Sequence, residues 1–161
     1  MNAGAMTNHV FMKEAIELSR KNIREGKGGP FAALVVKEGK VIARGTNLVT
    51  STNDPTSHAE VVAIREACRL LGTFQLNGCE LYTSCEPCPM CLGAIYWARP
   101  DKVYFANTRT DAAHIGFDDM FIYEEIALPI KGRKIPMIQI LREEALTAFW
   151  EWQKMQDKIH Y

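Results

Sequence analysis

Helical and strand-like patterns alternate along this chain, and that alternation constrains its fold more than any other feature. Phe11 and Ala15 belong to an apolar series at helical spacing, which predicts an amphipathic helix from about residue 8 to residue 25. The stretch PFAALVVKEGKVIARGTN then gives two β-rich runs on either side of Glu38 and Gly39. A glycine between two such runs is typical of a β-hairpin, because it accepts a positive φ.

The same alternation continues to the end of the chain. Turn residues in NDPTSHAE precede an apolar series that predicts a helix ending at Gly72. The later segments are expected to be a strand at ELYTS, a helix from Pro87 to about Trp97, a strand at KVYFAN buried on both faces, a short helix near 118–125, a last strand at KIPMIQIL and a helix over about 143–158. This order predicts one α/β domain over residues 1–161, a three-layer α/β/α sandwich around a mixed five-stranded sheet.

Charge and hydropathy exclude several classes of protein. Nineteen basic residues balance nineteen acidic ones, whereas a nucleic-acid-binding protein normally has an excess of Lys and Arg. The longest apolar run, residues 31–36, is too short to span a bilayer. The opening MNAGAMTNHV lacks the layout of a signal peptide, so we expect a cytoplasmic protein without a membrane or nucleic-acid partner. Residues 1–6 are expected to be disordered or to lie on the surface.

Five cysteines occur at positions 68, 79, 85, 88 and 91, and their spacing favours metal binding over disulfides. Cys88 and Cys91 lie three residues apart at the expected start of a helix, so both thiolates can reach one ion. His58, at the start of another helix, is the natural third ligand of a zinc site. Two helix N-termini would then meet at one metal.

Glu60 lies two residues after His58 and is expected to share the same space, because residues near a helix start are not fully helical. Three protein ligands leave one zinc position for water, whose pKa falls to about 7 when it is bound. Glu60 is suited to take that proton and pass it to a substrate. The alternative is a closed structural zinc site that also includes Cys85, which would leave Glu60 without a role.

The motifs HAE at 58–60 and PCPMC at 87–91 resemble those of the cytidine and deoxycytidylate deaminase superfamily. The stretches GGPFAALVV, TNDPTSHAE, DAAHIGFDDMFIYEEI and the terminal HY are similar to its bacterial guanine deaminase branch. This resemblance implies a cytidine deaminase-like fold with one zinc per subunit. It also implies hydrolysis of guanine to xanthine and ammonia, with attack of activated water at purine C2.

The resemblance also implies the residues that bind the base. Asn47 and the backbone of Ala59 would hydrogen-bond it, and Phe31 and Trp97 would pack on its faces. Asp119 would contact the amino group and relay a second proton. Each has a simpler alternative: Asn47 as a turn residue, the two aromatics as core, and Asp118 or Asp119 as a helix cap.

In the guanine deaminase branch, the C-terminal segment crosses to the other subunit of a dimer. By resemblance, we expect residues of about 143–161 to be swapped in a homodimer, with Tyr161 closing the pocket of the partner. A frayed terminus is the alternative.

Other functions are compatible with the same motifs. A guanosine, cytosine or tRNA adenosine deaminase would share the zinc chemistry, and the neutral charge argues against the tRNA enzyme. A zinc-binding module without catalysis is a different class. Replacing Glu60 distinguishes such a module from an enzyme, because an enzyme would lose turnover and a structural zinc site would not lose its function.

Overall fold

The computed structural model describes residues 3–161, with backbone only for residues 3–7. The chain forms two compact units, Met1–Asp119 and Met120–Tyr161, and each unit has its own set of elements. None of the described helices is both long and apolar enough to cross a membrane.

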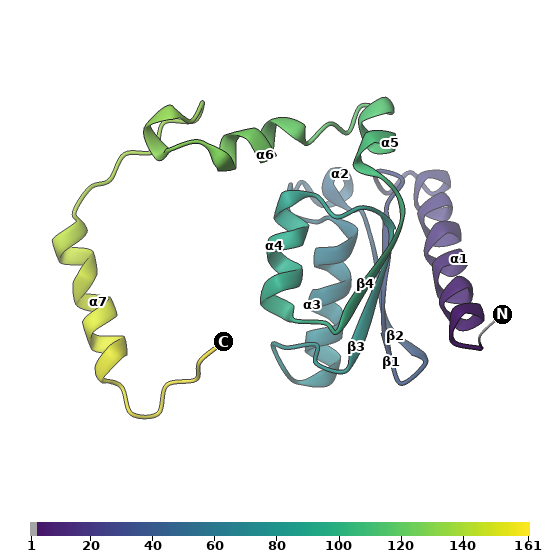
Figure 1. The fold of residues 1–161 in the computed structure, drawn as a ribbon, viewed down its shortest axis with the longest axis horizontal. Coiled ribbons are helices and arrows are strands. Elements are labelled where there is room, and N and C mark those ends of the chain that lie inside the picture. The colour runs from purple at the N-terminus through teal and green to yellow at the C-terminus, as the bar shows by residue number, and fades with distance from the viewer. Residues whose placement is uncertain (1–2) are drawn as a thin grey trace. The chain divides into compact units, whose positions relative to one another are not determined.

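The first unit is built on a four-stranded mixed sheet (Figure 1). Its strands are β1 (Ala32–Lys37), β2 (Lys40–Thr46), β3 (Cys79–Cys85) and β4 (Lys102–Asn107), in the order β2-β1-β3-β4. Strand β1 pairs antiparallel with both β2 and β3, and β3 pairs parallel with β4. The predicted hairpin is confirmed, since Glu38 and Gly39 both have positive φ between β1 and β2.

Helices cover both faces of this sheet, as the alternation predicted (Figure 1). Helix α1 (Ala3–Arg24) packs on one face through Phe11 and Ala15, against Leu34 and Tyr82. Helices α3 (Ala59–Leu71) and α4 (Pro89–Ala98) pack on the other face. Side chains along a strand point alternately to the two faces, so the same strands also supply the core on this side, including Ala33, Val35 and Leu81. The short helices α2 (Val49–Thr52) and α5 (Arg109–His114) complete the unit.

The N-terminal helix begins earlier than predicted, at Ala3 instead of about residue 8. Residues 1–6 were expected to be disordered or to lie on the surface; the backbone of residues 3–6 is helical, and residues 1–2 lie outside the described residues. Within this helix, Asn8 Oδ1 accepts a hydrogen bond from the buried Tyr82 hydroxyl at 2.9 Å.

The second unit contains α6 (Met120–Ala127), a 3-10 turn η1 (Ile130–Gly132) and α7 (Arg142–Lys154). The predicted fifth strand is not formed: residues 133–141 pair with no strand in the described part of the chain. Its apolar side chains are exposed, Ile138 by 82%. The prediction that β4 is buried on both faces is also wrong, because β4 is the edge of a four-stranded sheet and most of its residues are exposed.

Candidate active site

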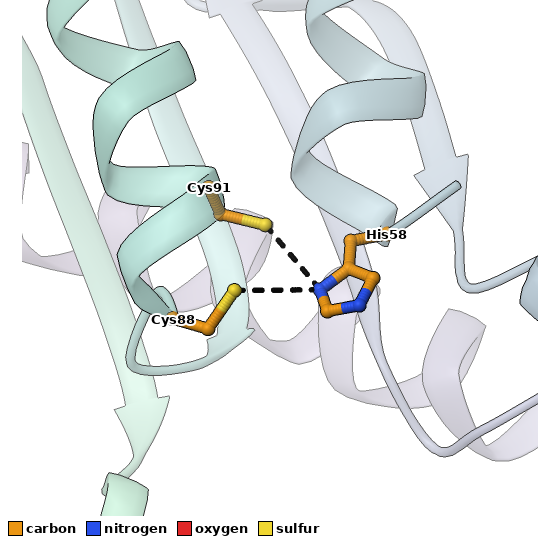
Figure 2. A group of neighbouring side chains, drawn as sticks. All are labelled: His58, Cys88 and Cys91. Carbon is orange, nitrogen blue, oxygen red and sulfur yellow. Dashed lines mark hydrogen bonds between the residues drawn. The ribbon is translucent and has the colours of Figure 1, made fainter. Parts of the chain in front are cut away.

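Three side chains from two helix N-termini converge in the first unit (Figure 2). His58 is the N-cap of α3 and Cys88 is the N-cap of α4, and both have extended backbone. His58 Nδ1 lies 3.5 Å from the Sγ atoms of both Cys88 and Cys91. One potential ligand atom from each of these residues lies within 4.8 Å of the others. A histidine nitrogen with two sulfurs is a donor set of catalytic zinc sites.

The local sequence explains why these side chains face one another. Helix α4 begins at Pro89 and not at Pro87, and proline is favoured at this first helical position. Cys88 is thus the N-cap and Cys91 lies three residues on, which places both on one face of the first turn. Neither cap side chain makes a capping hydrogen bond, so both are available to a metal ion.

The turn before His58 is held by one carboxylate. Asp54 Oδ1 accepts hydrogen bonds from the backbone N–H and the hydroxyl of Thr56, at 2.8 and 2.7 Å, and Oδ2 accepts one from the Ser57 hydroxyl at 2.7 Å. The hydrogen bonds from Ser57 and Thr56 lower the pKa of Asp54 to about 2. This turn fixes the chain where it enters α3.

The thiols differ in their readiness to ionise. The Cys91 thiol and His58 hydrogen-bond to Cys88, which together lower the pKa of Cys88 to about 4. The Cys85 thiol is buried, and this burial raises its pKa to about 11. Cys85 contacts the Thr108 carbonyl at 3.6 Å and is not part of the described ligand cluster, which argues against the four-ligand structural site.

Glu60 lies in the first turn of α3, two residues from His58, and is only 6% exposed. Its Oε1 accepts a hydrogen bond from the Thr83 hydroxyl at 3.1 Å, and its Oε2 lies 3.4 Å from Cys91 Sγ. Burial raises the pKa of Glu60. A buried carboxyl beside a metal-type cluster, with its pKa moved toward neutrality, is suited to proton transfer.

A cavity of about 470 Å³ opens over this cluster within the first unit. It is lined by His58, Cys88 and Glu60, by three more of the residues predicted from the sequence to act on the base, and by Asp118, Arg109 and Phe117. The three predicted residues are Phe31, Asn47 and Asp119. The structure therefore brings most of the predicted site together.

Asn47 is oriented by the backbone around it. Its Oδ1 accepts hydrogen bonds from the N–H groups of Gly29 and Val49, both at 3.3 Å. Because those groups can only donate, the amide NH₂ of Asn47 is left to donate to an acceptor in the cavity. Asn22 fixes this loop from behind, since its Nδ2 donates to the carbonyls of Gly29 and Asn47, each at 2.9 Å.

Phe31 and Asp119 form other parts of the cavity wall. The rings of Phe31 and Phe117 meet edge to face, with centroids 4.9 Å apart. Asp119 is half-buried, and burial followed by the nearby Cys88 raises its pKa.

The other predicted residues are placed differently. Ala59 is fully buried in the first turn of α3, where backbone N–H groups have no partner within the helix. Trp97 does not line the cavity in the described part of the chain and is 63% exposed. Tyr161 belongs to the second unit and is 69% exposed.

Sequence reasoning missed four of the residues that build the site: Asn22, Thr83, Arg109 and Phe117. Asn22 and Thr83 are nearly inaccessible polar residues, and each bonds a site residue far along the chain: Asn47 lies 25 positions from Asn22, and Glu60 lies 23 positions from Thr83. No local pattern marks such contacts. Arg109 lines the cavity from α5, a short helix that was not among the helices expected from the sequence.

Comparisons with known proteins agree with this geometry. Residues 6–107 match the family model for the cytidine and deoxycytidylate deaminase zinc-binding region. The chain is 54% identical to a guanine deaminase of Bacillus subtilis over 97% of this chain and 100% of the relative. It is 41% identical to a tRNA-specific adenosine deaminase of Aquifex aeolicus over 72% of this chain and 75% of that protein. An X-ray structure of guanine deaminase from Bacillus subtilis superposes with a TM-score of 0.93 at 53% identity, covering 100% of this chain and 99% of that one.

Proposed function

Because this chain belongs to the cytidine and deoxycytidylate deaminase family, we propose that it is a zinc-dependent hydrolase that converts guanine and water to xanthine and ammonia. One observation carries the proposal. The buried carboxyl of Glu60 lies beside a group of one imidazole and two thiols, at a cavity that a single protein unit encloses. Full-length similarity to a guanine deaminase supports the choice of substrate.

His58, Cys88 and Cys91 would hold one zinc ion per subunit. Bound there, zinc supplies Lewis-acid activation of a water molecule at neutral pH. The chain contributes the geometry, because both helices present their positive N-terminal ends to the two thiolates. These ligands fit zinc without any further residue.

Glu60 moves the proton. Its carboxylate accepts a proton from the attacking water and delivers it to a ring nitrogen of the purine as the oxygen bonds to C2. The bond from C2 to the amino group then breaks, and the amino group leaves as ammonia after receiving the second proton of the same water, which comes from the hydroxyl on C2 as that hydroxyl becomes the carbonyl of xanthine. Asp119 is positioned on the cavity wall to relay that proton. The oxygen of the water ends in xanthine.

The base is bound by two hydrogen-bond donors and by an apolar surface. The Asn47 amide donates to an acceptor on the purine edge, and the Ala59 backbone N–H donates from the helix terminus. Phe31 packs on one face of the ring, where its edge-to-face contact with Phe117 holds it. Trp97 and Tyr161 act on the base only if a second subunit brings them to a cavity.

A homodimer with exchanged C-terminal segments is part of the proposal. The second unit exposes large apolar side chains along its whole length, including Ile138, Phe149 and Trp150. Monomeric proteins rarely leave large apolar patches in water. A partner subunit would cover these side chains. Tyr161 would then close the partner's pocket.

Product analysis on a substrate panel tests the proposed reaction. Purified zinc-loaded protein is incubated with guanine, guanosine, adenine, cytosine and a tRNA anticodon stem that contains adenosine. Guanine should give equal amounts of xanthine and ammonia. Turnover of the tRNA stem instead would favour the tRNA adenosine deaminase, which the similarity to the Aquifex aeolicus protein makes the main rival. The cytoplasmic location stays a prediction that cell fractionation would test.

A further inference from the structure

Thr83 is a buried hydroxyl that the proposed mechanism does not use. It lies on β3, where its backbone is paired with Ala33 on one side and Phe105 on the other. Only 1% of the residue is exposed. Its hydroxyl bonds the catalytic carboxylate, Thr83 Oγ1 to Glu60 Oε1, at 3.1 Å. The Thr83 hydroxyl therefore links an inner strand of the sheet to the flexible side chain of Glu60 by a hydrogen bond.

The bond from Thr83 gains importance once the metal is bound. Thr83 and Cys91 are the side chains with hydrogen bonds to Glu60 in the described chain. A cysteine that ligates zinc is a thiolate and can no longer donate. The Thr83 hydroxyl then keeps its proton and its contact, while Cys91 is lost as a donor.

The two oxygens of Glu60 therefore have different surroundings. Oε1 is held by Thr83, and Oε2 lies on the side of Cys91 and the ligand cluster. A carboxylate with one oxygen fixed keeps its other oxygen aimed in one direction. Glutamate has three rotatable side-chain bonds, so an unfixed carboxylate would sample several rotamers. The β-branched threonine is itself restricted to few rotamers.

We propose that Thr83 is the positioning residue that fixes Oε1 of Glu60, so that Oε2 alone carries the proton between the water and the purine. This inference rests on the proposed function. Thr83 touches neither substrate nor metal, and it acts only through Glu60.

Two substitutions at position 83 separate positioning from packing. Thr83→Val keeps the shape and strand preference but removes the donor, and Thr83→Ser keeps the donor. We expect Thr83→Val to lower kcat by about 10–100-fold, the usual range for a residue that supports a catalytic ligand, with KM little changed. Thr83→Ser should restore most of kcat. Both variants should retain one zinc and the affinity of wild type for xanthine.

Ser84→Ala is the matched control on the same strand. Ser84 is also buried, and its hydroxyl accepts a hydrogen bond from the Ala32 backbone N–H at 3.0 Å without contact to Glu60. This variant should lower Tm and keep kcat. In a Glu60→Gln background, Thr83→Val should cause no further loss of turnover. A crystal structure of Thr83→Val should show Glu60 in more than one rotamer.

Several results would overturn the inference. A Thr83→Val protein with the kcat of wild type would overturn it. Equal losses of kcat in Thr83→Val and Thr83→Ser would also overturn it, because they would indicate that Thr83 matters only for packing. Loss of zinc or a single unchanged rotamer of Glu60 in Thr83→Val would also do so. If wild type turns over guanine and Glu60→Gln does not, such results refute the role of Thr83 and leave the proposed function intact. A wild type that is inactive on the whole panel removes both.

Discussion

Replacing Gly45 with alanine should move the first turn of α3 and so disturb the site from behind. Gly45 lies on β2 directly under that turn. A Cβ built there would lie 2.1 Å from the Ala59 carbonyl oxygen and 2.5 Å from the Ala63 backbone nitrogen. Both are backbone atoms of a helix that packs on the sheet, so neither can rotate away as a flexible side chain would.

The size of the effect follows from that clash. A Cβ essentially never approaches a heavy atom closer than 3.0 Å, so the strand and the helix must separate by about 1 Å. Overpacking of this kind costs roughly 1–3 kcal/mol, which lowers Tm by roughly 2–12 °C for a chain of this size. The displaced turn carries Glu60, and an error of about 1 Å in a catalytic group costs on the order of 10²-fold in rate.

Thermal unfolding, zinc content and ammonia release would measure the three consequences. Gly93→Ala is the matched control, because a Cβ at this helical position in α4 meets nothing within 4 Å of it. An exposed glycine replaced by alanine in a helix gains about 0.5–1 kcal/mol, so this variant should be active and slightly more stable. A Gly45→Ala protein with the Tm and turnover of wild type would refute the reasoning.

Other expected outcomes follow from single side chains of the site. His58→Ala and Cys88→Ala should each lose stoichiometric zinc by elemental analysis, and a full equivalent retained in both would contradict the ligand assignment. Cys85→Ser should keep one zinc, whereas a metal-free product would support the four-ligand site. Deleting residues 159–161 should reduce kcat/KM much more than Tm; unchanged turnover would remove the C-terminal tyrosine from the site. Because the folded-state pKa of Asp54 is lowered from 3.8 to about 2, its stabilising effect should be full above pH 3.8 and disappear as the pH falls toward 2. Urea unfolding should therefore show a difference between wild type and Asp54→Asn at pH 7 that shrinks across this window, and a difference independent of pH would contradict it.

The features of this structure that could be predicted from the sequence are those that depend on residues close together in the chain. The hairpin follows from Gly39, the end of α3 from Gly72, and the ligand cluster from the spacing of Cys88 and Cys91 next to a proline. In each case, neighbouring residues determine the backbone. The start of α4 was misplaced by two residues, because either of two prolines suits a first turn and only the structure distinguishes Pro89.

The features that were missed depend on contacts across the fold. The run KIPMIQIL has the composition of a buried strand, but a strand forms only when it pairs with another strand, and residues 134–141 pair with none in the described part of the chain. Strand β4 is exposed for a related reason, because it is an edge strand that pairs only with β3 in the described part of the chain. Thr83 bonds Glu60 and Asn22 bonds Asn47, each more than twenty positions away, and a sequence does not reveal which buried hydroxyl or amide will meet which partner.

Turnover of guanine by wild type and by Glu60→Gln, at matched zinc content, tests the proposed chemistry most directly. The amide keeps the size of the carboxylate but cannot accept and return a proton. We predict that wild type releases one ammonia per xanthine and that the variant binds one zinc, remains folded and loses turnover by several orders of magnitude. A Glu60→Gln protein that deaminates guanine at the wild-type rate would contradict the role assigned to the carboxylate and, with it, the proposed mechanism.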